Sequence, residues 1–137
     1  MLKIQTARRF GVMLAGAGAI TAALVLPANA AGSATASTVV SGTAWAGKCE
    51  AILYTNDVPQ ASSGTYQSQT ASDSEVCTGW LIRSADNGAT WSVVSGYHDV
   101  YDQGASSYTG WYWDGAGYQA KACVMDAAGA VACTAAW

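Results

Sequence analysis

The chain carries a single histidine, His98, and an acidic residue, Asp99, directly follows it. A Ser-His-Asp relay needs a carboxylate that orients the imidazole toward the serine hydroxyl. His98 and Asp99 fall in a segment predicted as a strand, where adjacent side chains point to opposite faces, so Asp99 is badly placed to orient His98. The sequence also lacks a Gly-x-Ser-x-Gly nucleophile motif. We therefore predict no catalytic triad.

The acidic residues do not suggest a pair for acid–base catalysis. Glycoside hydrolysis needs two carboxylates across a cleft about 5 to 10 Å wide. Most acids fall at predicted turns, where Asp is favoured for turn chemistry; these are Asp57, Asp73, Asp86, Asp102, Asp114 and Asp126. Glu50, Glu75 and Asp99 lie within predicted strands. An acid–base pair is the alternative, but we expect a non-enzyme without a cofactor.

Four cysteines are the remaining reactive residues: Cys49, Cys77, Cys123 and Cys133. An even number in a small exported chain indicates two disulfides. The last two cysteines flank an Asp-Ala-Ala-Gly turn signal, and a hairpin centred on Ala128 would set them opposite each other. We therefore expect Cys123–Cys133 and Cys49–Cys77 bridges. A zinc site is the alternative, but there is no Cys-x-x-Cys spacing and one histidine, so no metal is predicted.

Residues 1–30 are interpreted as a cleavable signal peptide. Basic residues precede an uncharged run over 11–26, and residues 28–30 (Ala-Asn-Ala) give the small-x-small pattern of a cleavage site. This run is shorter than the about 20 apolar residues of a spanning helix, and glycines interrupt it. We predict cleavage after Ala30, secretion to the extracellular space and no membrane span.

Cleavage at that point would leave about 107 residues with an acidic balance. The remaining chain has nine acidic residues and three basic ones, Lys48, Arg83 and Lys121, which gives a net charge of −6. Three scattered cations do not form a positively charged surface that would bind phosphate backbones or anionic lipid. Nucleic acid and membrane surfaces are therefore not expected partners.

The rest of the chain has the pattern of one all-β domain over residues 38–137, preceded by a flexible arm over 31–37 that has no large apolar residue. Short runs rich in Val, Ile, Thr, Tyr and Trp alternate with Gly, Asp, Asn and Ser clusters, without helical spacing. This predicts a small β-sandwich, or a compact barrel, of about eight short antiparallel strands. The expected strands are 38–46, 48–55, 64–70, 75–84, 90–100, 106–114, 118–125 and 130–137, with a loop at 56–63 and a tight connection at 71–74.

The segment Ser84-Ala85-Asp86-Asn87-Gly88-Ala89-Thr90-Trp91 resembles the Asp-box motif Ser-x-Asp-x-Gly-x-Thr-Trp at every defined position. The resemblance implies a structural turn built on Ser84, Asp86, Gly88 and Trp91. In such a turn the Asp side chain accepts backbone N–H groups, Gly adopts a positive φ and Trp packs beneath the hairpin. Asp boxes recur once per blade in sialidases and other propellers, and one copy cannot make a propeller. A catalytic or calcium-binding carboxylate is the alternative.

Residues 108–118 form an aromatic-rich segment. In a strand, Trp111 and Trp113 would share one face and Tyr112 the other. In one interpretation, the tryptophans fill the core and Tyr112 pairs across strands with a residue such as Tyr97. The other makes the rings a contact surface; its candidate residues are Tyr101, Tyr108, Trp111, Tyr112, Trp113 and Tyr118.

In overall style the chain resembles small secreted two-disulfide β-proteins of high-GC bacteria, which include tendamistat-type hydrolase inhibitors and adaptor subunits of secreted toxin particles. The features that carry this resemblance are the Ala-rich signal, the acidic β-domain and the closing run from Ala122 to Trp137. The leading hypothesis is a protein-interaction module, such as an adaptor, in which the N-terminal arm next to Thr38, Val39 and Val40 adds as a strand to a partner. The alternatives are inhibition of an extracellular hydrolase and binding of carbohydrate.

Overall fold

The computed structural model describes residues 36–69 and 75–137. These residues belong to one compact unit and form ten β-strands without a helix. The prediction of an all-β domain is therefore confirmed. The predicted signal peptide, nearly all of the arm and the connection at 71–74 lie outside the described residues.

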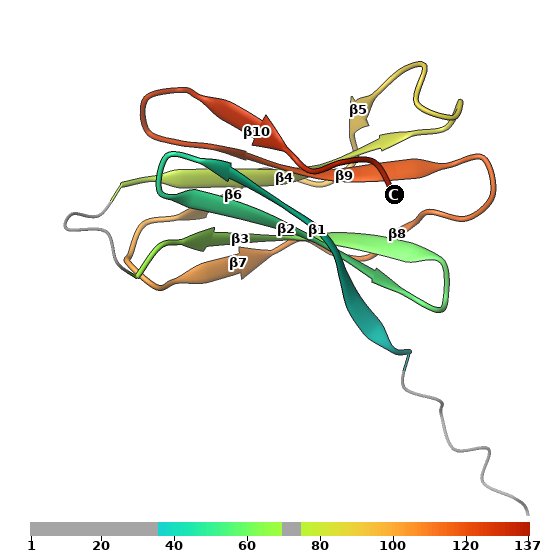
Figure 1. The fold of residues 1–137 in the computed structure, drawn as a ribbon, viewed down its shortest axis with the longest axis horizontal. Helices are drawn as coiled ribbons and strands as arrows, with labels where there is room; N and C mark the ends of the chain where they lie inside the picture. Colours follow the sequence, from blue (N-terminus) through green and yellow to red (C-terminus); the bar gives the residue numbers. More distant parts are fainter. Residues whose placement is uncertain (1–35, 70–74) are drawn as a thin grey trace, which may run out of the picture. The chain divides into compact units, whose positions relative to one another are not determined.

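Two antiparallel sheets of five strands each face one another (Figure 1). Sheet A has the order β1-β2-β3-β7, and β8 also pairs with β3. Its strands are β1 (Thr38–Ala46), β2 (Cys49–Asn56), β3 (Gln60–Gln67), β7 (Ser106–Tyr108) and β8 (Tyr112–Trp113). Sheet B has the order β10-β9-β4-β5, and β6 also pairs with β4. Its strands are β4 (Cys77–Ser84), β5 (Ser92–Val93), β6 (His98–Val100), β9 (Gln119–Met125) and β10 (Val131–Cys133).

The expected loop over residues 56–63 is wrong, because β3 already begins at Gln60. A short turn joins β2 to β3, in which the Gln60 backbone N–H donates to Asn56 Oδ1 at 3.1 Å. Pro59 falls inside this turn, where its missing N–H is not needed. The first half of β3 is Gln-Ala-Ser-Ser, which has the composition of a loop but fits a strand that faces a very thin interior.

Two expected strands are each interrupted, so that 90–100 becomes β5 and β6 and 106–114 becomes β7 and β8. At each break a buried hydroxyl replaces a backbone acceptor of the sheet. Ser95 Oγ accepts the Leu81 N–H at 2.8 Å, and Thr109 Oγ1 accepts the Ser63 N–H at 2.9 Å. Ser and Thr offer such alternatives to ladder hydrogen bonds, which explains why the regular pairing stops there.

The core between the sheets is built from small side chains. Its fully buried apolar members are Leu53, Leu81 and Val124 together with alanines and cysteines. No aromatic residue is among the buried residues of the described chain, and Trp111 and Trp113 are exposed. The interpretation that tryptophans fill the sandwich is therefore wrong.

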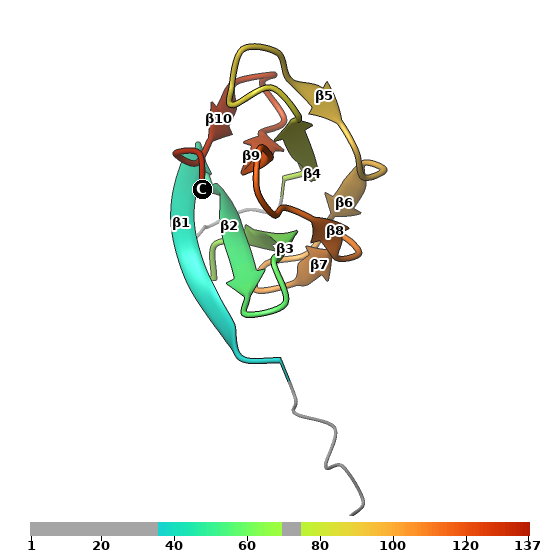
Figure 2. The ribbon, with the colours of Figure 1, turned by 90° about the vertical axis from the view of Figure 1, so that its right-hand side faces the viewer.

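The two sheets lie too close together for large side chains at their centre. A Cβ added to Gly79 on β4 would lie 1.6 Å from Thr65 Oγ1 on β3 of the opposite sheet. Figure 2 shows the strands of both sheets enclosing this interior. Close packing at this point therefore requires glycine on one sheet and a small residue on the other.

Both predicted disulfides are confirmed. Cys49–Cys77 joins β2 of sheet A to β4 of sheet B with a Cα–Cα distance of 5.4 Å. Cys123–Cys133 links residues directly opposite each other on β9 and β10. Such bridges indicate an oxidising, extracellular-type environment. Among the described residues, no helix has the length and apolarity to span a membrane.

We predict that Gly79→Ala destabilises the protein by about 3 kcal/mol or prevents folding, because the new methyl group would collide with Thr65 and force the sheets apart. Gly96→Ala is the matched control, since a Cβ there meets nothing within 4 Å. Urea unfolding of both variants measures the effect. Equal unfolding midpoints would show that the sheets can separate at Gly79 without cost.

We predict that the two disulfides contribute unequally to stability. Cys49–Cys77 closes a separation of 28 residues and is fully buried, whereas Cys123–Cys133 closes one of 10. Loop entropy alone makes loss of the first pair more costly by about 1 kcal/mol. Guanidinium unfolding of the two double Cys→Ala variants provides the comparison, and a larger loss for Cys123→Ala/Cys133→Ala would contradict the prediction.

Candidate functional site

The outer face of sheet A carries an unusual number of large side chains. Alternate residues of β2 point to the core, while Glu50, Ile52 and Tyr54 between them point outward and are half-buried. The strand register sets Val40 and Ser62 on either side of Tyr54. The large residues that are missing from the core therefore gather on this outer face.

Three tyrosines from three strands close over Gly64 of β3. A Cβ at Gly64 would lie 2.8 Å from Tyr54 Cε2, and Tyr66 Cε2 and Tyr108 Cε1 are nearly as close. The Tyr54 and Tyr66 hydroxyls are hydrogen-bonded at 2.6 Å, and the Tyr66 hydroxyl is also hydrogen-bonded to that of Tyr108. Burial and these two hydrogen bonds raise the pKa of Tyr66. The tyrosine cluster, Tyr54, Tyr66 and Tyr108, is thus a fixed arrangement of rings.

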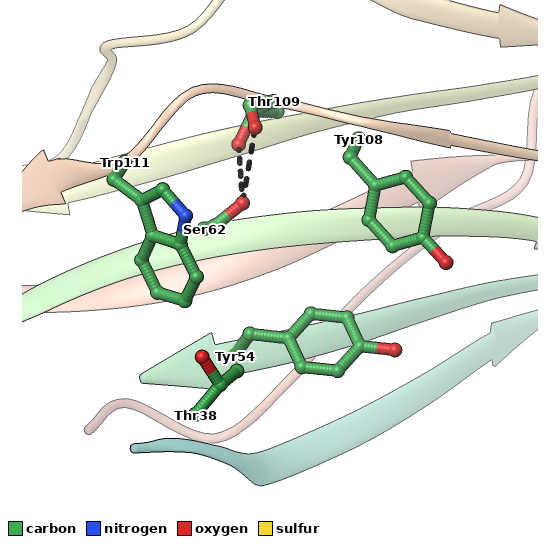
Figure 3. A pocket seen from close by; sticks show the side chains of 6 residues that line it. All are labelled: Thr38, Tyr54, Ser62, Tyr108, Thr109 and Trp111. Atoms are coloured by element: carbon green, nitrogen blue, oxygen red, sulfur yellow. Dashed lines mark hydrogen bonds between the residues drawn. The ribbon is translucent and has the colours of Figure 1, made fainter. Parts of the chain in front are cut away.

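A pocket of about 290 Å³ lies beside the tyrosine cluster (Figure 3). Its lining residues are Thr38, Tyr54, Ser62, Tyr108, Thr109 and Trp111. We call it the sheet A pocket. Figure 3 shows the rings of Tyr54, Tyr108 and Trp111 around the hollow, with the Thr38 side chain at its rim beside Tyr54.

The hydroxyl groups in the floor of this pocket are tied to the backbone. Ser62 Oγ donates to the Thr109 carbonyl at 3.1 Å, and Thr109 Oγ1 donates to the Gly110 carbonyl at 2.9 Å. Both side chains are buried. The floor is therefore rigid, and its two hydroxyl protons are already engaged.

The structure brings three of the candidate contact residues together, since Thr38, Tyr108 and Trp111 all line the pocket. Val40 lies beside Tyr54 in the register, and Trp113 on β8 is exposed at the same sheet. Val39 is also exposed, on the adjacent position of β1.

Three other candidates lie elsewhere. Tyr112 packs against the core, opposite Ala61 and not Tyr97, whose ring instead contacts Trp80. The Tyr101 hydroxyl donates to Asp99 Oδ2 at 3.2 Å on sheet B. The Tyr118 ring lies under the Arg83 guanidinium.

Sequence reasoning missed Tyr54, Tyr66, Ser62 and Thr109. The alternation of residues 49–56 did contain a signal for Tyr54, because it separates Glu50, Ile52 and Tyr54 from the buried positions. Ser62 was hidden by the wrong start of β3, and Thr109 by the undetected break between β7 and β8. Tyr66 lies within the expected strand 64–70, but its pairing with two other tyrosines had no signal in the sequence.

The segment 84–91 forms a turn held by side chains. Asp86 Oδ1 accepts the Thr90 N–H at 2.8 Å, and Ser84 Oγ accepts the Gly88 N–H at 2.8 Å. Hydrogen bonds from the hydroxyls of Ser84 and Thr90 lower the pKa of Asp86 to about 2. Gly88 has a φ of 88°, and the Trp91 indole N–H donates to its carbonyl at 3.1 Å. All these contacts serve the turn itself.

His98 and Asp99 have separate surroundings. His98 Nδ1 lies 3.4 Å from Ser107 Oγ, whereas Asp99 Oδ1 accepts the Thr78 hydroxyl at 2.7 Å. The two side chains therefore do not form the orienting pair of a relay. A cluster of Cys49, Glu75 and Cys77 has ligand atoms within 4.8 Å of one another, but its two sulfurs are joined in the disulfide and offer no thiolate.

A buried carboxylate follows Trp113. Asp114 is 5% exposed, and neither of its oxygens has a hydrogen-bond partner among the described residues. Burial raises the pKa of Asp114 to about 6, although the charge of Arg83 opposes the rise. Arg83 itself donates from Nη1 to the Trp113 carbonyl at 2.7 Å and lies 4.7 Å above the Tyr118 ring.

We predict that Asp114 makes the folded state less stable as the pH rises from about 4 to about 6. The folded pKa is raised, so stability is fully present below the unfolded value of about 4 and is lost as the pH passes about 6. Urea unfolding over this pH range should show the decline, and Asp114→Asn should remove it. A variant that retains the same slope would assign it to another group.

Comparisons with known proteins give little information about this site. No protein-family model matches the chain, and no curated protein matches it. A solved structure that does match is the endonuclease/exonuclease/phosphatase from Beutenbergia cavernae DSM 12333, at 15% sequence identity and a TM-score of 0.35. The match covers 76% of this chain and 26% of that one, so the chain spans about a quarter of that protein's length. A similarity at this level assigns neither a fold family nor an activity.

Proposed function

We propose that this protein is a secreted, non-enzymatic interaction module that binds another extracellular protein along the edge of β1 and over the sheet A pocket. The observation that carries the proposal is the pair of adjacent valines, Val39 and Val40, which are 53% and 58% exposed on an edge strand. Thr38, directly before them, lines the pocket.

The position of β1 in the sheet supports strand addition. It is the terminal strand of sheet A and pairs with β2 through its other edge. The register shifts between Val40 and Gly42, and before that point the strand extends away from sheet B (Figure 1). An edge strand offers main-chain donors and acceptors to an extended partner segment, and exposed side chains on alternate faces give specificity.

Both faces of this strand end would be covered by a bound partner. Val39 and Val40 are neighbours, so their side chains point to opposite faces, and both are exposed. Exposed apolar side chains that are grouped on one face are typical of interaction sites. On the outer face, Val40 continues into Tyr54 and the pocket.

The disulfides and the charge of the chain support a secreted module that binds protein. Two disulfides suit a secreted protein, and its acidic balance suits a protein partner better than nucleic acid. An adaptor subunit of an extracellular assembly, such as a secreted toxin particle, is the form of this role that we favour.

The proposal predicts that Val39→Asp/Val40→Asp abolishes partner capture without unfolding the domain. The tagged protein is incubated in culture supernatant of the organism that encodes it, and bound proteins are identified by mass spectrometry. Recovery of the partner should fall at least about tenfold, because each carboxylate would be buried unpaired in the interface.

Val93→Asp/Val131→Asp is the matched control, because these valines are 43% and 55% exposed on sheet B. Thermal unfolding should be similar for the wild type and both variants. The proposal is contradicted if the sheet A variant retains the partners of the wild type, or if the sheet B variant alone loses them.

A further inference from the structure

We propose that the sheet A pocket receives the guanidinium group of an arginine side chain presented by the bound partner. This inference rests on the proposed function, because it names the chemistry by which the same surface selects its partner.

The walls of the pocket are largely aromatic. Three of its six lining residues are aromatic, and the Tyr54 and Tyr108 ring centroids are 6.1 Å apart with an angle of 48° between the rings. The faces of aromatic rings carry the negative end of their quadrupole and attract cations. Figure 3 shows both tyrosine hydroxyls directed away from Trp111 and Thr38, so ring carbons face the hollow.

The polar groups of the floor favour a donor ligand. The Ser62 and Thr109 hydroxyls already donate to backbone carbonyls, and Thr109 Oγ1 also accepts the Ser63 N–H. The capacity left in the floor is therefore that of an acceptor, mainly at Ser62 Oγ. Guanidinium has five N–H donors and no acceptor, and it stacks on aromatic faces. A neutral sugar needs convergent donors as well as acceptors, which these two hydroxyls do not supply.

The acidic charge of this chain also favours a cationic ligand. Asp57 Oδ1 accepts the backbone N–H of Ser37, the residue directly before the pocket residue Thr38. Glu50 is on the same outer face of sheet A. Beyond residue 30 the chain has nine acids against three cations, so a basic partner is favoured over an acidic one.

The chain already pairs cations with aromatic rings on its other surfaces. Lys121 Nζ lies 4.3 Å from the centroid of the Trp91 ring, and the Arg83 guanidinium lies 4.7 Å from that of Tyr118. None of the residues that line the sheet A pocket is charged. The pocket thus offers the same kind of ring surface to a cation from outside the chain.

The site is also rigid before a ligand arrives. The hydrogen bonds through Tyr66 fix the Tyr54 and Tyr108 rings, and Gly64 holds them close to the sheet. A pre-organised pocket loses little side-chain entropy when it binds. Its volume of about 290 Å³ is at the small end of ligand pockets, which suits one side chain rather than an oligomer.

The test is a titration of the purified protein with N-acetyl-arginine amide, followed by NMR of the Trp111 indole and the Tyr108 ring. N-acetyl-citrulline amide is the control ligand, because it has nearly the same shape without the charge. We expect saturable shifts in the millimolar range for the arginine compound and none for the citrulline compound. Trp111→Leu should weaken binding at least about fivefold.

Trp45→Leu is the matched protein control, since Trp45 is 53% exposed on the outer face of sheet A but does not line the pocket. It should leave the affinity unchanged. Equal binding of both ligands, or saturable binding of maltose at the same resonances, would overturn the cation site. Shifts that Trp111→Leu does not affect would overturn it too.

Failure of this inference can be separated from failure of the proposed function. If Val39→Asp/Val40→Asp loses the partner while the arginine compound does not bind, the interaction module stands and the guanidinium site is rejected. If the arginine compound binds but the partner is retained by that variant, the edge-strand interaction is rejected instead.

Discussion

The close approach of the two sheets at Gly79 and Thr65 constrains the rest of the molecule. A side chain larger than hydrogen at residue 79 has no room, and Thr65 is the residue that fills the space. The interior therefore holds alanine, serine, threonine and cysteine with a few larger aliphatic residues. Such an interior buries little apolar surface per residue, so the disulfide between the sheets supplies a constraint that a larger core would make less necessary.

Small hydroxyl residues have a second role in this thin sandwich. Ser95, Thr109 and Thr134 are buried, and each accepts a backbone N–H from a neighbouring strand. Each also donates its hydroxyl to the carbonyl of the next residue. The three contacts replace ladder hydrogen bonds where the strands stop, so the backbone stays satisfied without regular pairing.

The sequence predicted the features that depend on local pattern. The bounds of β1 follow from strand-forming composition, and the Cys123–Cys133 bridge follows from a turn signal, which leaves Cys49 and Cys77 as the second pair. The start of β3 and the breaks at Ser95 and Thr109 did not, because a serine can belong to a turn or to a buried strand depending on the distance to the opposite sheet. For the same reason the pocket could be anticipated at Trp111 and Tyr108, but not at Ser62 or Thr109.

The thin core also explains why the outer face is rich in aromatic rings. An interior that excludes tryptophan and tyrosine leaves all thirteen of these residues at least partly exposed. On sheet A, Gly64 allows three of the rings to lie close to the strand, and the hydroxyl-mediated break at Thr109 lets the chain carry Trp111 to the other side of the hollow. The pocket is thus a consequence of the same small residues that bring the sheets together.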